Sequence, residues 1–95
     1  MKHTVTLYLA ATRTNGRYFT LDAADVSDTD WRGGARLYEL PDGFQAVQAG
    51  EGGYIHDTRG YACTLETVLD GSGCLYPMLI SRKGSFRLPL AKEVG

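Results

Sequence analysis

The most distinctive local composition in the chain is an acidic run that ends in an aromatic residue. It comprises Asp22, Asp25, Asp28, Asp30 and Trp31, with no basic residue before Arg32. Carboxylates at this density could coordinate calcium, or form a recognition surface for a basic partner with tryptophan as its anchor. The alternative interpretation is a solvated exit from a strand, with Trp31 folded into the core.

The calcium interpretation fails on one ligand position and on the absence of an expected helix after the loop. If Asp28 takes the first position of an EF-hand loop, then Asp30, Gly33 and Glu39 fall on later ligand or turn positions of that loop. Arg32, however, places a cation where a ligand should be, and Glu39 lies in an expected strand with no exiting helix. We therefore expect a protein-binding surface here, with no bound metal and no cofactor.

A second group of reactive types surrounds a glycine-rich segment and comprises His56, Asp57, Arg59 and Cys63. A Cys63–His56 nucleophilic pair would need an activated thiol and an oriented imidazole, and no family signature surrounds the cysteine. The two histidines and two cysteines of the chain also match no zinc ribbon or finger spacing. We predict a loop histidine and structural thiols, in a protein that is not an enzyme.

Basic residues gather near the last turn, at Arg82, Lys83 and Arg87. Together with an aromatic strand face they could bind single-stranded nucleic acid, because bases stack on aromatic rings and phosphates attract cations. The aromatic residues expected on that face are Tyr8, Tyr18 and Tyr38. Exposed arginines that protect hairpin tips from aggregation are the alternative.

Composition indicates one small globular domain. The chain has 95 residues, 43% hydrophobic and 22% charged, with a formal net charge of −1. That charge gives no global attraction for nucleic acid or an anionic membrane. No apolar run approaches the roughly 20 residues that span a bilayer, and no signal peptide is visible. We expect a cytoplasmic protein.

The elements that would position these residues are marked by four glycine-ended loops between runs of alternating apolar residues. The loops are Thr14-Asn15-Gly16, Pro41-Asp42-Gly43, Gly71-Ser72-Gly73 and Arg82-Lys83-Gly84. Three-residue loops of this kind connect β-hairpins. The sequence therefore predicts a mainly β fold, an antiparallel meander of six or seven short strands forming a sheet or small barrel, with at most one short helix.

Each loop also predicts a register, because directly opposed residues share a face of the sheet. The expected pairs are Leu9 with Leu21, Leu40 with Phe44, Leu69 with Leu75, and Ile80 with Phe86. In this register Cys63 and Cys74 lie too far apart for a disulfide.

Two segments are less decided. Thr64 to Asp70 can be a strand, or a short helix with Thr64 as its N-cap and Gly71 as its stop. Gly50 to Gly60 carries four glycines, which indicates a mobile loop around a short extended piece at Tyr54-Ile55.

The phrase Phe19-Thr20-Leu21-Asp22-Ala23-Ala24-Asp25-Val26, in a small chain without catalytic motifs, resembles accessory proteins of bacteriophages and mobile elements, of the anti-CRISPR kind. The resemblance implies stoichiometric binding to a host effector complex, with the acidic run as part of the interface. The expected function is therefore non-catalytic protein binding, and more narrowly inhibition. The alternative is a small β-barrel that binds single-stranded nucleic acid.

Overall fold

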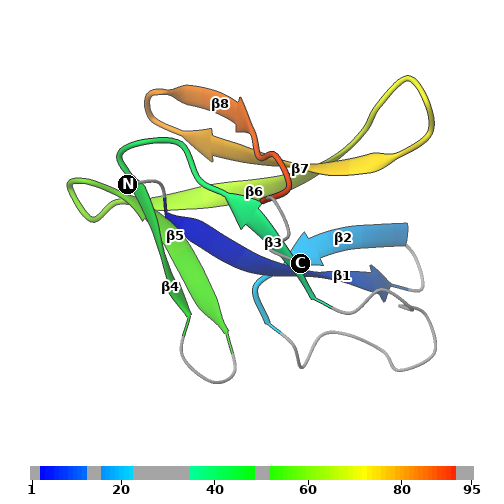
Figure 1. The fold of residues 1–95 in the computed structure, drawn as a ribbon, viewed down its shortest axis with the longest axis horizontal. Coiled ribbons are helices and arrows are strands. Elements are labelled where there is room, and N and C mark those ends of the chain that lie inside the picture. Colours follow the sequence, from blue (N-terminus) through cyan, green and yellow to red (C-terminus); the bar gives the residue numbers. More distant parts are fainter. Residues whose placement is uncertain (1–2, 13–15, 23–34, 49–51, 92–95) are drawn as a thin grey trace.

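The computed structural model describes residues 3–12, 16–22, 35–48 and 52–91 (Figure 1). The strands in these ranges are β1 (Thr4–Thr12), β2 (Gly16–Thr20), β3 (Arg36–Glu39), β4 (Phe44–Gln48), β5 (Gly53–Asp57), β6 (Ala62–Leu69), β7 (Leu75–Ser81) and β8 (Gly84–Arg87). They form two antiparallel sheets, a three-stranded one in the order β2-β1-β3 and a five-stranded one in the order β4-β5-β6-β7-β8.

The predicted fold class is confirmed: the protein is mainly β and antiparallel. The two sheets do not close into a barrel, and the described residues form eight strands where six or seven were predicted. No helix occurs in these residues. The segment that could have been a helix is strand β6, so the strand interpretation of 64–70 is correct.

Alternating apolar residues of both sheets form a shared core. Val5, Leu7 and Leu9 enter it from β1, Ile55 from β5 and Leu79 from β7. Leu79 is fully buried, and truncating such a side chain to alanine costs about 2–5 kcal/mol. Burial of this core is what fixes the register of each strand, because a one-residue slip would turn the apolar side chains outward.

The chain passes from one sheet to the other at the end of β8. The Leu88 N–H still donates to the Pro77 carbonyl of β7 at 3.1 Å, whereas the next carbonyl, of Pro89, accepts from the Glu39 N–H of β3 at 2.8 Å. The Ala91 N–H then donates to the Leu37 carbonyl at 2.9 Å. Residues 89–91 therefore cover the outer edge of β3.

Side chains satisfy two other edges of the three-stranded sheet. β2 ends at Thr20, opposite Tyr8, so it does not pair with the first residues of β1. There the side-chain amide of Gln48 pairs with the β1 backbone. Gln48 Oε1 accepts from the Thr6 N–H at 3.0 Å, and Nε2 donates to the Thr6 carbonyl at 2.8 Å. On the far edge of β2, the Phe19 N–H donates to Thr67 Oγ1 at 2.9 Å. These contacts reduce the backbone available for edge-to-edge association.

Two predicted pairings in the first half of the chain are wrong. Leu9 lies opposite Phe19 and not Leu21; because the shift is two residues, the same side chains still share the inner face. The turn at Pro41 forms, with the Phe44 N–H donating to its carbonyl at 3.2 Å, but it joins the two sheets and closes no hairpin. Leu40 therefore does not pair with Phe44, which lies opposite Asp57.

In the second half, Leu69 pairs with Leu75 as predicted. The last register is wrong by one residue, because Phe86 lies opposite Leu79 and not Ile80. The hydroxyl of Ser81 accepts from the Lys83 N–H at 3.1 Å and donates to the Gly84 carbonyl at 3.0 Å, which closes a two-residue loop. Ile80 and Phe86 are thereby placed on opposite faces.

The segment Gly50 to Gly60, predicted as a loop around a short extended piece at Tyr54-Ile55, contains strand β5 (Gly53–Asp57), so the extended piece is confirmed and is longer than predicted. A Cβ at Gly53 would collide with the carbonyl oxygen of Val47, so this glycine permits close approach of β4. Both cysteines are free, as predicted.

Candidate functional site

The five-stranded sheet has an inner face on the shared core and an opposite face, which we call the outer face. The outer face follows from the register of β4 to β8 and from side-chain alternation along a strand. It comprises Gln45, Val47, Tyr54, His56, Ala62, Thr64, Glu66, Val68, Tyr76, Met78, Ile80, Ser85 and Arg87.

The composition of the outer face is that of an interface. Aliphatic, methionine and aromatic side chains predominate, and its two charged residues, Glu66 and Arg87, have opposite signs and flank Met78 in one row across the sheet. Aromatic residues, Met and Arg are the types enriched in protein interfaces, where charged residues are depleted at the centre. The face therefore suits a partner that buries apolar surface.

The exposed large hydrophobic side chains of the outer face lie on β4 and β5. Val47 is 41% exposed and Tyr54, directly opposite it, is 48% exposed. The Tyr54 ring lies 5.7 Å from the His56 ring, centroid to centroid. Two aromatic rings and an aliphatic side chain are thus available here to one partner.

A basic and aromatic cluster lies at the end of the same sheet, where the β5–β6 loop meets the β7–β8 turn. The Arg82 guanidinium stands 4.0 Å above the centre of the Tyr61 ring, and Lys83 and Arg59 are close enough to Asp57 to help lower its carboxyl pKa. Two of the residues predicted for nucleic-acid binding, Arg82 and Lys83, therefore lie beside the β5–β6 loop.

The third predicted residue, Arg87, lies apart from them on the outer face. Its guanidinium is 4.0 Å from the centre of the Tyr76 ring and 4.0 Å from Asp70 Oδ2. The tyrosines predicted for base stacking do not share a face: Tyr38 lies opposite Val5 on the inner side and is buried, whereas Tyr8 and Tyr18 point outward from the three-stranded sheet.

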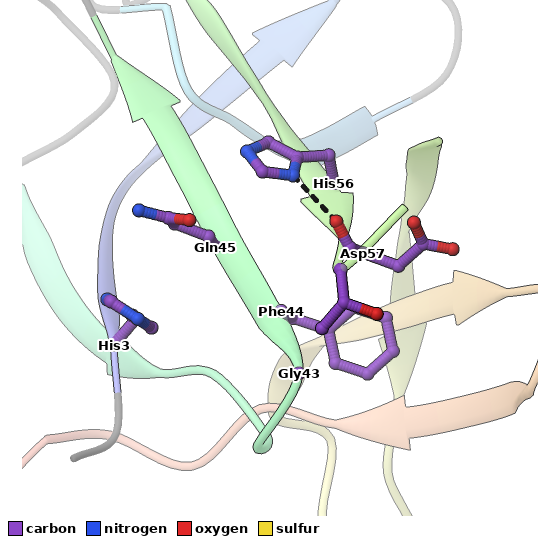
Figure 2. Close-up of a pocket in the computed structure, with 7 residues that line it drawn as sticks. His3, Gly43, Phe44, Gln45, His56 and Asp57 are labelled. Atoms are coloured by element: carbon purple, nitrogen blue, oxygen red, sulfur yellow. Dashed lines mark hydrogen bonds between the residues drawn. The ribbon is translucent and has the colours of Figure 1, made fainter. Parts of the chain in front are cut away.

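A cleft of about 270 Å³ lies between the start of the chain and strands β4 and β5. Its lining, drawn in Figure 2, includes His3, Phe44, Gln45, His56 and Asp57. His56 Nδ1 lies 2.8 Å from the Asp57 carbonyl oxygen; since a carbonyl can only accept, Nδ1 is the donor of this hydrogen bond. The Asp57 carboxylate points away from the imidazole and accepts from the Arg59 and Tyr61 N–H groups at 2.9 and 3.0 Å.

These bonds give Asp57 a structural role. Burial acts to raise the pKa of its carboxyl, but the hydrogen bonds from Tyr61 and Arg59 and the charges of Lys83 and Arg59 outweigh it, so the pKa lies below its usual value. An ionised carboxylate already holding two N–H groups is suited to closing a loop.

The geometry separates the two residues weighed as a nucleophilic pair. Cys63 lies opposite Ile55 on the inner side of β6, whereas His56 points to the outer face. Burial, and then the negative charge of Asp57, raise the pKa of the Cys63 thiol, which favours its protonated form. Among the described residues, no three side chains of the His, Cys, Asp or Glu types come close enough to hold a metal ion.

Of the predicted acidic run, only Asp22 is described; its N–H donates to Thr20 Oγ1 at 3.1 Å and its side chain is half-buried. Asp25, Asp28, Asp30 and Trp31 lie outside the described residues. The prediction of an interface there stands as a prediction.

Sequence reasoning missed the outer face. Its signal was present: Tyr54 and His56 alternate with Ile55, and Tyr76, Met78 and Ile80 alternate with Pro77 and Leu79. Both faces of β7 are apolar, however, so alternation alone did not show which set faces solvent.

No helix in the described part of the chain is long and apolar enough to cross a membrane. Comparison with protein-family models, with curated proteins and with solved structures found no match for this chain.

Proposed function

We propose that this protein is a non-catalytic binding protein that recognises a protein partner through the outer face of its five-stranded sheet. The observation that carries the proposal is the pair Val47 and Tyr54, which lie directly opposite each other on this face and are 41% and 48% exposed. Aromatic and aliphatic side chains of this kind, once buried at the centre of an interface, supply most of its binding energy.

Charge favours a protein over a nucleic acid on this surface. The outer face carries one acidic and one basic side chain, so it offers little net attraction to a phosphate backbone, whose neutralisation by cations dominates nucleic-acid affinity. The narrower hypothesis, an inhibitor that binds a host effector complex, rests on the sequence resemblance and on the acidic run. It would add Asp25, Asp28, Asp30 and Trp31 to the interface.

The test is a comparison of two matched exposed side chains on different sheets. Tyr54 is 48% exposed on the outer face, and Leu37 is 46% exposed on the three-stranded sheet. Proteins captured from the native host lysate by the wild type are identified by mass spectrometry, and the affinity of each purified candidate is measured for Tyr54→Ser and Leu37→Ser.

We expect Tyr54→Ser to weaken a specific partner by about tenfold or more, because an aromatic anchor contributes about 2 kcal/mol or more. Leu37→Ser should stay within about twofold. Equal weakening by both variants, or by neither, would contradict the outer face as the interface. Asp28→Lys with Asp30→Lys tests the acidic run separately and should leave the melting temperature unchanged.

A second candidate, binding of single-stranded nucleic acid, is favoured by the stacked Arg82–Tyr61 pair beside Lys83. It predicts that a fluorescent oligothymidine binds at low salt, that its affinity falls steeply as salt rises, and that Arg82→Gln with Lys83→Gln abolishes binding. An unchanged anisotropy at 50 mM salt would reject it.

A further inference from the structure

A second recess lies between the two sheets, on the opposite side of the five-stranded sheet from the outer face. It has a volume of about 300 Å³ and is bounded by the inner side of β1, β2 and β3 and by the β6–β7 loop. The β1–β2 hairpin and the β6–β7 hairpin extend toward the same side of the molecule in Figure 1. Leu9, Phe19 and Leu75 give this recess an apolar floor.

Two arginines border the apolar floor. Arg17 lies opposite Ala11 on β2, and Arg36 lies opposite Leu7 on β3. Because residues separated by an even number along a strand share a face, both arginines belong to the same inner row as Leu7 and Leu9. Both arginines are exposed and line the recess.

Tyr38, two residues beyond Arg36 on β3, adds a polar group to the lining. Its ring packs edge-on against Phe19, with centroids 5.8 Å apart at 78°, and its hydroxyl is hydrogen-bonded to the Arg36 side chain. Burial raises the pKa of Tyr38, so the hydroxyl stays neutral and able to donate. None of the described lining residues is acidic.

An apolar floor between two guanidinium groups has a definite chemical preference. Guanidinium binds carboxylate and phosphate through paired charge-assisted hydrogen bonds, and an apolar floor with aromatic edges accepts a flat ring. We propose that this recess binds a small organic anion in which an aromatic or other apolar ring carries a phosphate or carboxylate group. The volume, at the lower end of ligand sites, fits one ring with one anionic substituent.

The inference is independent of the proposed function, because none of the lining residues belongs to the outer face. Phenyl phosphate serves as the probe, with inorganic phosphate as the anion alone and phenol as the ring alone. Binding is followed by amide chemical shifts of the ¹⁵N-labelled full chain, in the wild type, Arg17→Gln and Arg36→Gln. Arg59→Gln is the matched control, since Arg59 is an exposed arginine in the β5–β6 loop, outside the recess.

Phenyl phosphate should shift the amides of Leu9, Phe19 and Leu75 saturably, and bind about tenfold or more tightly than either half alone. Arg17→Gln and Arg36→Gln should each weaken it about fivefold or more, a loss of the size expected for one charge-assisted bond, and Arg59→Gln should leave it unchanged. If the Arg36→Gln variant does not fold because it loses the hydrogen bond to Tyr38, the Arg17→Gln variant still tests the proposal.

Cys74 provides a second readout, because this exposed free thiol also lines the recess. Saturating phenyl phosphate should slow its alkylation by iodoacetamide and leave the rate at half-buried Cys63 unchanged. The proposal is overturned if phenyl phosphate gives no saturable shift, if inorganic phosphate binds equally well, if Arg59→Gln weakens binding as much as Arg17→Gln does, or if both thiols are slowed equally.

Discussion

The β5–β6 and β6–β7 loops are built on one five-residue pattern, Asp57 to Tyr61 and Asp70 to Cys74. In each, the aspartate carboxylate accepts from the N–H groups two and four residues later, at 2.9 and 3.0 Å in the first loop and 2.8 and 3.0 Å in the second. The aspartate N–H donates to the carbonyl four residues on, at 3.0 and 2.8 Å. The glycines at the fourth position have φ values of 86° and 89°.

The two loops differ in their surroundings. Asp57 is only 6% exposed and belongs to the inner row of β5, opposite Phe44. Asp70 is at a hairpin tip, where the Ser72 hydroxyl also donates to it at 2.6 Å and where it faces Arg87. The same hydrogen-bond pattern thus closes one loop against the core and the other in solvent. The two aspartates should therefore contribute differently to the stability of the fold, although their local hydrogen bonds are alike.

The largest expected difference is between Asp57→Ala and Asp70→Ala. Removing the buried Asp57 carboxylate breaks two part-buried hydrogen bonds and leaves their N–H donors without an acceptor, and we expect the melting temperature to fall by more than about 5 °C. Asp70→Ala should cost clearly less, because water replaces the lost acceptor. Thermal unfolding followed by circular dichroism measures both; equal losses would show that burial does not distinguish the loops.

Substitution of the corresponding glycines should destabilise the two loops to the same extent. Gly60 and Gly73 both need a left-handed backbone, and neither has a heavy atom within 4 Å of a built Cβ. Gly60→Ala and Gly73→Ala should therefore each lose about 1–2 kcal/mol from backbone conformation alone. Denaturant titration gives the two values, and a difference as large as that between the aspartate variants would mean that the loops differ in backbone and not in burial.

The smallest effect is the dependence of stability on pH. The hydroxyl of Ser72, the N–H groups of Cys74 and Ser72, and Arg87 lower the pKa of Asp70, and the pKa of Asp57 is also lowered. A carboxyl whose pKa is lower in the folded state contributes stability above its unfolded pKa of about 3.9, and loses it as pH falls through the folded value.

Acid should therefore destabilise the wild type below about pH 4. Asp57→Asn and Asp70→Asn should each flatten that dependence while retaining an acceptor oxygen. Melting temperatures between pH 2 and 7 measure the effect. An Asn variant whose melting temperature depends on pH as the wild type's does would show that this carboxylate does not cause the acid destabilisation.

Sequence reasoning reached the fold class and the hairpin at Asp70, because clean alternation on both sides of a loop specifies which residues oppose each other. The pairing of Tyr38 with Val5 was not predicted. The turn from Pro41 to Phe44 was interpreted as a hairpin, because its residues are the same whether it closes a hairpin or connects two sheets. The last register failed by one residue because the hydroxyl of Ser81 shortens that loop.

The candidate site was harder to predict from the sequence than the fold. Only the Tyr54-Ile55 part of β5 was predicted as extended, because glycines surround it, although Asp57 and Gly60 repeat the spacing of Asp70 and Gly73. The outer face depends on five strands brought together by long-range pairing, and no single segment carries its signal. The recess bordered by Arg17 and Arg36 likewise joins residues whose proximity arises only when β2 and β3 flank β1.

Site-specific photo-crosslinking tests the outer face most directly. A benzoylphenylalanine residue is placed at position 54 or, as the control, at position 37, in the full chain expressed in its native host. If the outer face is the interface, position 54 gives a discrete protein adduct that position 37 does not give. This adduct is lost when Tyr76→Ser is added. The same adduct from both positions, or an adduct to nucleic acid alone, would contradict the outer face as the interface.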